Sequence, residues 1–196
     1  MTRAKLLALF TPAVIVIAID QWTKWLVRTT PDLHRYDIIE GWLMFYYTKN
    51  SGMALGIDIL DTHIVSLISI TATIGIVAYL LYTIKESPVS YLLLMGLVIG
   101  GALGNIIDRL TMAYIGGYGG LLDGHVVDFI FFYLKIGDRT LFPYIFNVAD
   151  IAISVSIFTL LIFNRKFFPK EVEAENDVIT PEDVASEIVN DAPKED

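Results

Sequence analysis

Four apolar stretches, each close to the length needed to cross a bilayer, constrain this chain more than any other feature. A helix that spans the hydrocarbon needs about 20 residues. The chain has 196 residues, is 55% hydrophobic and has a mean hydropathy of +0.59, which is typical of a multi-span membrane protein rather than a soluble domain. We predict a mainly α-helical membrane protein with four transmembrane helices, at residues 6–27, 64–84, 89–107 and 147–168.

The formal net charge of −8 is concentrated at the end of the chain. Residues 171–196 hold most of the surplus acid, and Lys194 is the sole basic residue after Lys170. We predict a disordered, solvated tail there and a single membrane domain over residues 1–170. The rest of the chain is close to neutral, and we expect no nucleic-acid partner. The absence of cysteine excludes disulfides, thiolate metal ligands and a cysteine nucleophile.

A chain that crosses the membrane four times returns repeatedly to the same side. The ends of the first and third spans, the connections that follow them and the start of the fourth span all share one side. The unusual polar groups fall in this set: Asp20, "TKNSGMALG", "GNIIDR", "HVVDF" and "FNVAD". The sequence therefore predicts that they gather at one face of the bundle. Basic residues divide evenly between the two sides, so charge alone leaves the orientation open, although those nearest the span ends favour cytoplasmic termini.

An ionisable residue in a span needs an explanation, because an unpaired charge in hydrocarbon is costly. Asp150 heads the apolar run of the fourth span and can cap a helix, a role that Asn147 can fill as well. Taken alone, Asp150 is explained equally well by capping and by a catalytic role. Asp128 in "HVVDF", taken alone, is more simply a charge on a surface strand or turn.

Other polar and small residues also have structural interpretations. Asp20 and Lys24 are four residues apart and can pair on one helix face, while Asp108 and Arg109 can form an interfacial ion pair. The three histidines show no ligand spacing, and we expect no metal site. In the third span a repeated G-x-x-x-G spacing favours close helix packing, and it is formed by Gly96, Gly100, Gly101 and Gly104.

The segment at residues 34–57 is rich in aromatic and β-branched residues, and "GWLMFYYT" is its best strand candidate. The segment is too short and too polar to cross the membrane, so we predict a small sheet at the membrane surface. Gly52 and Ala54 would let the backbone of a ligand approach this sheet closely.

Asp128 and Asp150 are joined by a loop that begins and ends on one side, so they can converge at the mouth of the bundle. Two neighbouring carboxylates in a site of low dielectric cannot both ionise cheaply, and one then keeps its proton near neutral pH. In an aspartic hydrolase the ionised carboxylate takes a proton from water while the protonated one polarises a carbonyl. Donors and charge balance would come from Asp20, Asn50, Asn105, Asp108, Arg109 and Asn147.

Five motifs in order give the chain a family resemblance: "DQWTK", "KNSGMALG", "GGALGNIIDR", "VVDF" and "FNVAD". With them the chain resembles the signal peptidase II family, the lipoprotein signal peptidases of bacterial membranes, over roughly residues 6–163. The resemblance implies a small extracytoplasmic sheet between helices one and two, cytoplasmic termini and an active site at the extracytoplasmic face of the inner membrane. The implied reaction removes the signal peptide from a prolipoprotein, N-terminal to a cysteine that carries diacylglycerol.

The resemblance also implies roles for single residues. Asp128 and Asp150 match the catalytic pair. The positions that match or adjoin the site-lining and substrate-holding motifs are Asp20, Lys24, Asn50, Gly52, Ala54, Asn105, Asp108, Arg109, Asn147 and Ala149. Expected partners are lipid-modified prolipoproteins, membrane lipid and cyclic peptide inhibitors such as globomycin. Water is the expected nucleophile, so neither a metal nor an organic cofactor is expected.

The main alternative is an ion- or proton-coupled transporter that uses the same carboxylates. Transporters commonly have an inverted repeat and binding sites near the bilayer midplane. The sequence shows no such repeat and places its acids at one face, which favours the peptidase.

Overall fold

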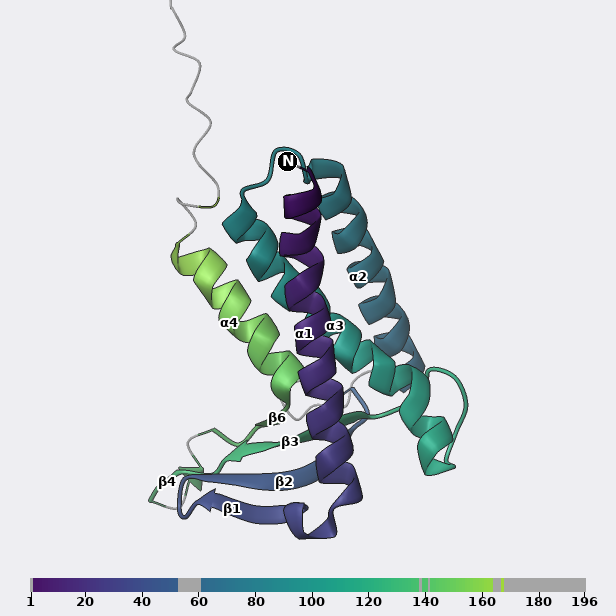
Figure 1. Ribbon diagram of the computed structural model, residues 1–196. Coiled ribbons are helices and arrows are strands. Elements are labelled where there is room, and N and C mark those ends of the chain that lie inside the picture. The colour runs from purple at the N-terminus through teal and green to yellow at the C-terminus, as the bar shows by residue number, and fades with distance from the viewer. Residues whose placement is uncertain (1, 53–60, 138, 141, 164–166, 168–196) are drawn as a thin grey trace, which may run out of the picture.

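The computed structural model describes residues 2–52, 61–137, 139–140, 142–163 and 167. Helices form the bundle and short strands close one end of it (Figure 1). The helices are α1 (Thr2–Thr29), α2 (Thr62–Thr83), α3 (Val89–Gly116) and α4 (Val148–Ile162), with a 3-10 turn, η1, at Pro31–Leu33. The strands are β1 (Arg35–Ile39), β2 (Leu43–Asn50), β3 (Val126–Phe132), β4 (Lys135–Ile136), β5 (Arg139–Thr140) and β6 (Ile145–Phe146).

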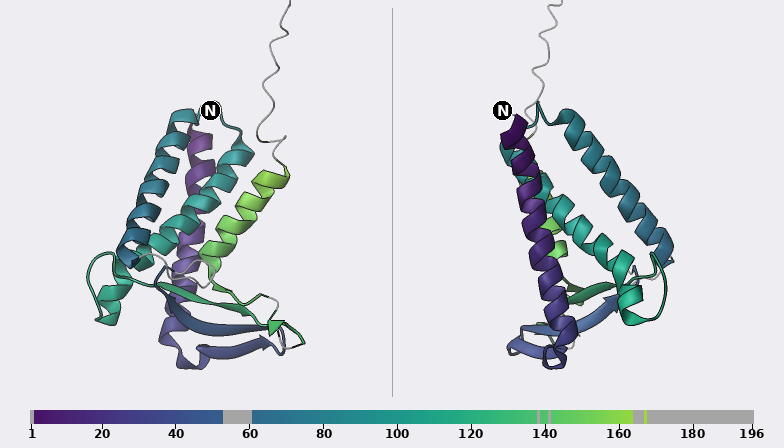
Figure 2. Two further views of the ribbon diagram at one scale, coloured as in Figure 1. Left: turned by 180° about the vertical axis from the view of Figure 1, so that it is seen from behind. Right: turned by 45° about the vertical axis from the view of Figure 1, so that its right-hand side comes forward.

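The sheet closes one end of the helix bundle. The N-terminus and the α2–α3 connection lie at one end of the bundle, and the sheet lies at the other (Figures 1 and 2). Helix α1 runs from the N-terminal end down to the sheet, while α4 begins beside β6. The predicted gathering of the connections at one end is therefore present in the structure.

Within the part of the chain that the structure describes, three helices, α1, α2 and α3, are long and apolar enough to cross a membrane. Helix α3 continues to Gly116, beyond residue 107, where the predicted third span ends. Asp108 and Arg109 therefore lie inside the helix and not at its end. The helix stops where Gly117 takes a left-handed conformation (φ 67°), which an L side chain adopts at a cost.

Helix α4 begins where predicted, since Asn147 is its N-cap. It has 15 residues and ends at Ile162, earlier than the predicted end at residue 168. Phe167 is described as helical, but residues 164–166 and 168 lie outside the described part of the chain. The predicted tail at residues 171–196 also lies outside it, so the domain limits stay a prediction.

Glycines allow α3 to touch its neighbours at backbone distance, as the G-x-x-x-G spacing predicted. A Cβ on Gly96 would lie 2.3 Å from the carbonyl oxygen of Leu9 in α1, and one on Gly101 would lie 2.5 Å from that of Ala149 in α4. Any side chain at these positions would push the helices apart. The small-residue face of α3 therefore brings α1 and α4 together around it.

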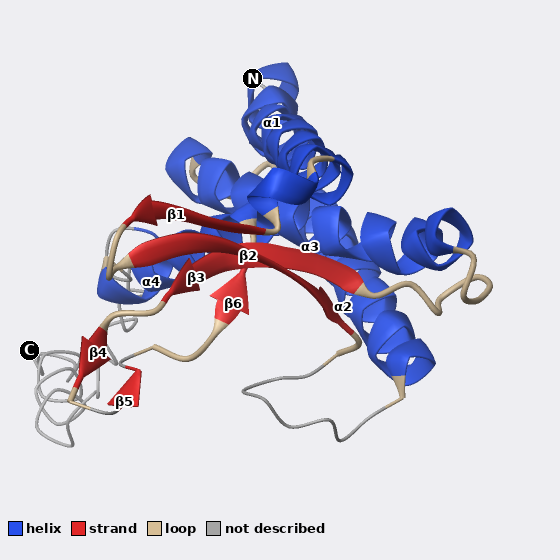
Figure 3. Cartoon of the chain, turned by 90° about the horizontal axis from the view of Figure 1, so that it is seen from below, coloured by secondary structure: helices blue, strands red, loops and turns tan. Residues whose placement is uncertain are grey.

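The main sheet is antiparallel, with strand order β1-β2-β3-β6 (Figure 3). We predicted it between the first two helices, but only β1 and β2 come from that connection. The other half, β3 and β6, comes from the connection between α3 and α4. Strand β2 pairs with β3 in a register that sets Thr48 opposite Asp128 and Asn50 opposite Val126. The predicted strand at "GWLMFYYT" is confirmed as β2, and its pairing partner carries one of the two candidate aspartates.

Candidate active site

Asp128 and Asp150 meet where the sheet joins the last helix. Asp128 lies on β3, and Asp150 is the third residue of α4. Asn147 stands between them: its Nδ2 donates to Asp128 Oδ1 over 2.7 Å, and its backbone N–H donates to Asp150 Oδ2 over 3.1 Å. One asparagine therefore holds one oxygen of each carboxylate.

Asp128 is buried, with only 2% of its surface exposed. It does lie on a strand, but it is not the surface charge that its local sequence suggested. Its second oxygen, Oδ2, accepts a hydrogen bond from Asn50 Nδ2 over 3.0 Å. Burial, and next the negative charge of Asp150, raise the pKa of Asp128 to about 7, against the hydrogen bonds from Asn50 and Asn147.

Asp150 both caps its helix and faces the site. Its side chain and that of Asn147 form a reciprocal capping box, in which Asp150 N–H donates to Asn147 Oδ1 over 3.0 Å. The other oxygen, Oδ1, accepts from Asn105 Nδ2 over 2.9 Å. Its carboxylate therefore receives side-chain and backbone donors at the positive end of a helix, where a negative charge is favoured.

Lys24 is the buried cation beside this pair, with 1% of its side chain exposed. Its ammonium forms ion pairs with Asp20 Oδ2 at 2.8 Å and Asp108 Oδ2 at 2.9 Å. Its third hydrogen bond goes to Asn105 Oδ1, also over 2.9 Å. The predicted Asp20–Lys24 pair is confirmed, and all three ammonium protons have acceptors.

The two carboxylates on Lys24 each hold the backbone next to one candidate aspartate. Asp108 Oδ2 accepts the N–H of Val127, the residue before Asp128, over 3.0 Å. Asp20 Oδ1 accepts the N–H of Ala149, the residue before Asp150, over 3.0 Å. We call Lys24, Asp20 and Asp108 the ion triad. It fixes strand β3 and helix α4 relative to each other.

Arg109 does not pair with Asp108, contrary to the ion pair that the sequence suggested. Asp108 instead directs its carboxylate to Lys24 because α3 packs directly on α1. Arg109 is buried, and its Nη1 contacts the carbonyl oxygen of Ser51 at 3.4 Å, just after β2 ends. Its positive charge interacts favourably with both Asp128 and Asp150. It thus links the end of β2 to the two aspartates.

Gly52 lies at the same edge of the site, with a φ of 132°. Its N–H donates to Asn50 Oδ1 over 2.9 Å, which orients the Asn50 amide so that Nδ2 points to Asp128. Ala54, the other small residue predicted here, lies outside the described residues. The structure therefore places every predicted site residue at this junction except Ala54, of which nothing is described.

Comparison with known proteins identifies the family to which this chain belongs. The family model described as Signal peptidase (SPase) II matches residues 12–165, which include both aspartates and the whole ion triad. The chain belongs to the signal peptidase II family. A relative from Pelodictyon phaeoclathratiforme, named lipoprotein signal peptidase, is 34% identical over 169 residues, covering 83% of this chain and 92% of its own. One of the same name from Shouchella clausii is 38% identical over 149 residues, covering 74% and 84%.

A solved structure supports the same assignment. It is described as a bacterial membrane enzyme, has a TM-score of 0.61 and 28% identity to this chain, and the match covers 83% of this chain and 91% of that one. Like the other members of the signal peptidase II family, this protein is a multi-pass bacterial membrane enzyme of the aspartic peptidase class.

Two residues of this signal peptidase II site did not stand out in the sequence. Gln21 Nε2 donates to Asp108 Oδ1 and to the carbonyl oxygen of Gly104, each over 3.0 Å. Because Lys24 pairs with the other oxygen of Asp108, Oδ2, both oxygens of that carboxylate have a donor. Gly124 packs on the backbone of α3, where a Cβ would lie 2.2 Å from the carbonyl oxygen of Asp108. The available signals were the position of Gln21 directly after Asp20 and of Gly124 shortly before Asp128.

Proposed function

We propose that this protein is a lipoprotein signal peptidase that removes the signal peptide from diacylglyceryl-modified prolipoproteins, cutting N-terminal to the lipidated cysteine. The observation that carries the proposal is the bridge of Asn147 between two aspartates, one on a strand and one on a helix. The shared name of the relatives supports the substrate class. The transporter alternative lacks a comparable observation, since the acids lie at the bundle end and not midway along the helices.

The catalytic roles follow from the different surroundings of the two carboxylates. Asp128, whose pKa is raised to about 7, is the carboxylic acid of the pair and donates its proton towards the scissile carbonyl oxygen. Asp150, at the helix N-terminus with donors on both oxygens, is the general base that takes a proton from the attacking water. The water oxygen bonds to the carbonyl carbon, forming a tetrahedral diol.

The second half of the reaction breaks the C–N bond. The proton held on Asp150 moves to the leaving amine, and Asp128 recovers its proton from the diol as the carboxylic acid product forms. Water is the only co-reactant, so the reaction requires no metal or organic cofactor. Asn50, Asn105, Asn147 and Arg109 position the aspartates and the substrate backbone, while Gly52 leaves room for that backbone beside the end of β2.

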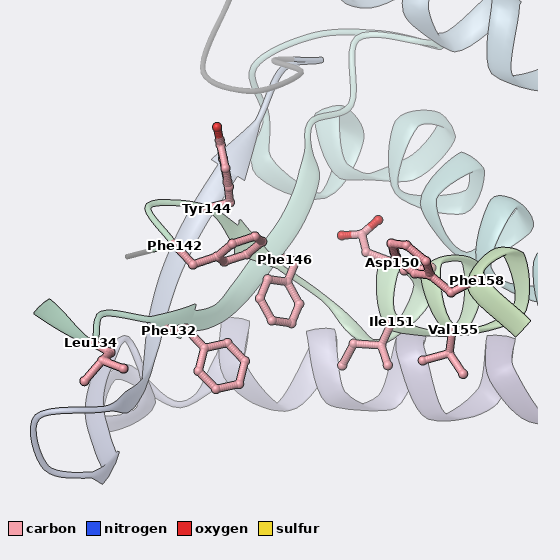
Figure 4. Close-up of a pocket in the computed structure, with 10 residues that line it drawn as sticks. Phe132, Leu134, Phe142, Tyr144, Phe146, Asp150, Ile151, Val155 and Phe158 are labelled. Carbon is pink, nitrogen blue, oxygen red and sulfur yellow. The ribbon is translucent and has the colours of Figure 1, made fainter. Parts of the chain in front are cut away.

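An apolar cavity beside Asp150 supports a lipid-bearing substrate. Its volume is about 780 Å³, and Figure 4 shows Phe142 and Phe146 on one side of it and Ile151 and Val155 of α4 on another. Of the described residues that line it, Asp150 alone carries a charge. A substrate whose cysteine carries acyl chains could place apolar groups here while its peptide bond stays at the carboxylates.

The proposed topology puts both termini, and a tail at residues 171–196, in the cytoplasm. The sheet and the aspartates then lie at the extracytoplasmic face of the inner membrane, where a diacylglyceryl-modified cysteine would be anchored in the leaflet. Membrane lipid surrounds the bundle, and a cyclic peptide such as globomycin would compete with the substrate backbone at β2. Cysteine labelling of the α2–α3 connection and of the β1–β2 turn from outside intact cells tests this: only the turn is expected to react.

The decisive experiment incubates the purified protein with a diacylglyceryl-modified precursor and with the same precursor lacking the lipid. Processing of the modified precursor only, at the bond before the cysteine, is expected. Equal processing of both would contradict the lipid requirement, and processing of neither would contradict the proposed activity. Mass spectrometry of the released peptide identifies the bond.

A further inference from the structure

A second hollow lies on the other face of strand β3 from Asp128. Val127 lines it, and because side chains alternate along a strand, Val127 points away from the face that carries Asp128. Its volume is about 160 Å³, roughly five times the 30 Å³ that one water occupies in the liquid. The hollow is therefore large enough for a tetrahedral oxyanion and is separate from the dyad.

Basic and hydroxyl-bearing side chains line this hollow. Arg28 of α1 and Lys49 of β2 contribute permanent positive charges, Tyr47 and Tyr118 contribute hydroxyl-bearing rings, and His125 contributes an imidazole. Among the described residues no aspartate or glutamate lines it. Lys49 Nζ instead lies over the Tyr118 ring, 5.1 Å from its centroid. Such a lining favours an anionic ligand.

One of these cations has an unused donor. Arg28 Nε is buried and has no hydrogen-bond partner in the structure. A buried N–H that gives up water without a protein acceptor is destabilising, and such groups in native proteins usually serve a ligand or a bound water. A guanidinium matches a phosphate with two parallel hydrogen bonds. The unused donor therefore points to an oxyanion and not merely to a general positive field.

Exposed aromatic residues beside the hollow indicate the depth of lipid headgroups. Trp25, one turn before Arg28, and Trp22 are exposed on α1, and Tyr114 is exposed on α3 close to Gly116, which lines the hollow. Exposed tryptophan and tyrosine on transmembrane helices gather at the membrane–water interface. The charged groups thus stand beside the aromatic residues that mark that interface.

We propose that Arg28, Lys49 and the adjoining aromatic residues form a binding site for a phosphate group, separate from the peptidase pair Asp128 and Asp150. The source of the phosphate is either the headgroup of a phospholipid in the surrounding leaflet or a free phosphate. Neither source needs the peptidase activity, so this proposal stands or falls independently of it.

Binding is tested on the full chain in a phosphate-free detergent by isothermal titration with three probes. These are dihexanoylphosphatidylglycerol, dihexanoylglycerol with the same chains but no phosphate, and inorganic phosphate. We expect saturable binding of the first, at least about tenfold tighter than of the second. Equal binding of the first two, or no saturable binding of either phosphate probe, would overturn the proposal. Tighter binding of the lipid than of inorganic phosphate assigns the headgroup as the source, and equal binding assigns a free anion.

Matched variants locate the site. Arg28→Gln and Lys49→Gln are each expected to weaken binding of dihexanoylphosphatidylglycerol by about tenfold. The control variants are Arg35→Gln on β1 and Lys135→Gln on β4. Each removes the same charge away from the hollow and is expected to leave this binding unchanged. Lys49 is exposed on β2, so its variant folds even if the Arg28 variant does not. Wild-type affinity in Lys49→Gln, or an equal loss in the control variants, would refute the site.

Discussion

Asn147 and Asp150 hold each other in place: each backbone N–H donates to the other's side chain, over 3.1 Å and 3.0 Å. This capping box fixes the side-chain orientation of Asp150 before any substrate binds. Because Asn147 also donates to Asp128, the cap that starts α4 is part of the proposed catalytic unit. Capping and catalysis were alternatives for Asp150 in the sequence, and in the structure the two are compatible.

Removing either carboxylate should abolish cleavage and leave the fold intact. Asp128→Asn and Asp150→Asn preserve shape and most hydrogen bonds but remove the proton-transfer groups, so we expect losses of roughly 10²–10⁴-fold or more. The double variant should lose no more than the single ones, because the pair acts as a unit. Processing of a lipid-modified precursor on a gel measures this; wild-type cleavage by either single variant would remove the dyad from the mechanism.

Activity should decline as the pH rises through about 7. Asp128 must hold the proton that polarises the carbonyl, and its raised pKa places the loss of that proton near 7. Asn50 opposes the rise by donating to the ionised form, so Asn50→Ala should move the alkaline limb of kcat/KM to higher pH. Thr48→Ala on the same strand serves as the control. An unmoved limb in Asn50→Ala would argue that another group sets it.

Asp128 should also make stability depend on pH. Since its folded pKa lies above the unfolded value near 3.8, its favourable contribution is complete below about pH 4 and is lost as the pH rises through 7. Asp128→Asn has no carboxyl to ionise, so it avoids the loss of folding free energy that ionisation of Asp128 causes, which is on the order of 4 kcal/mol above pH 7. We expect the variant to gain stability over wild type at pH 8 but not at pH 4. Thermal unfolding in detergent at both pH values is the measurement, and a gain independent of pH would contradict the explanation.

Loss of Lys24 should be among the most destabilising single changes. Lys24→Met leaves Asp20 and Asp108 buried and unpaired, at a cost of about 3–5 kcal/mol. Lys135→Met, at an exposed position, is the control. Adding Asp108→Asn to Lys24→Met should recover part of the loss, because it removes one uncompensated charge. The measurement is the unfolding midpoint of wild type, Lys24→Met, Lys135→Met and the double variant Lys24→Met/Asp108→Asn. A loss of stability in Lys24→Met no larger than in Lys135→Met would mean that the ion triad does not stabilise the fold.

Two glycines offer a matched test of helix packing. Gly101→Ala would place a methyl group 2.5 Å from the Ala149 carbonyl oxygen and should cost about 1–3 kcal/mol while displacing α4. Gly75 in α2 has nothing within 4 Å of its Cβ position, so Gly75→Ala should be neutral or stabilise by about 0.5–1 kcal/mol. Activity should fall only for Gly101→Ala. Similar behaviour of the two variants would rule out close packing as the reason for glycine.

Several elements could be predicted from the sequence because their causes are local. Apolar runs located the helices, and Asn147 marked the start of α4 within one residue. The length of α3 could not be predicted, since Asp108 remains inside the helix only because its charge is neutralised by Lys24 from another helix. Strand β6 has two residues and no pattern of its own, and it exists because β3 offers an unpaired edge.

The candidate aspartates could be predicted because charges near apolar runs demand an explanation. Gln21 escaped notice for the opposite reason: a neutral amide carries no such signal, and its role depends on two acceptors that α3 supplies. The sequence suggested that Asp108 pairs with the adjacent Arg109, whereas in the structure it pairs with Lys24 of α1. This pairing likewise depends on tertiary packing.

The hydrogen bond from Ala149 to Asp20 joins the first helix to the last. During synthesis the N-terminal part of a chain folds first, so Asp20 and Lys24 enter the membrane long before residues 147–150 leave the ribosome. Until then no partly made chain presents Asp150, or the cap that orients it, to the first helix. The proposed peptidase is therefore inert throughout its own insertion and becomes competent in a single late step, when the fourth helix docks.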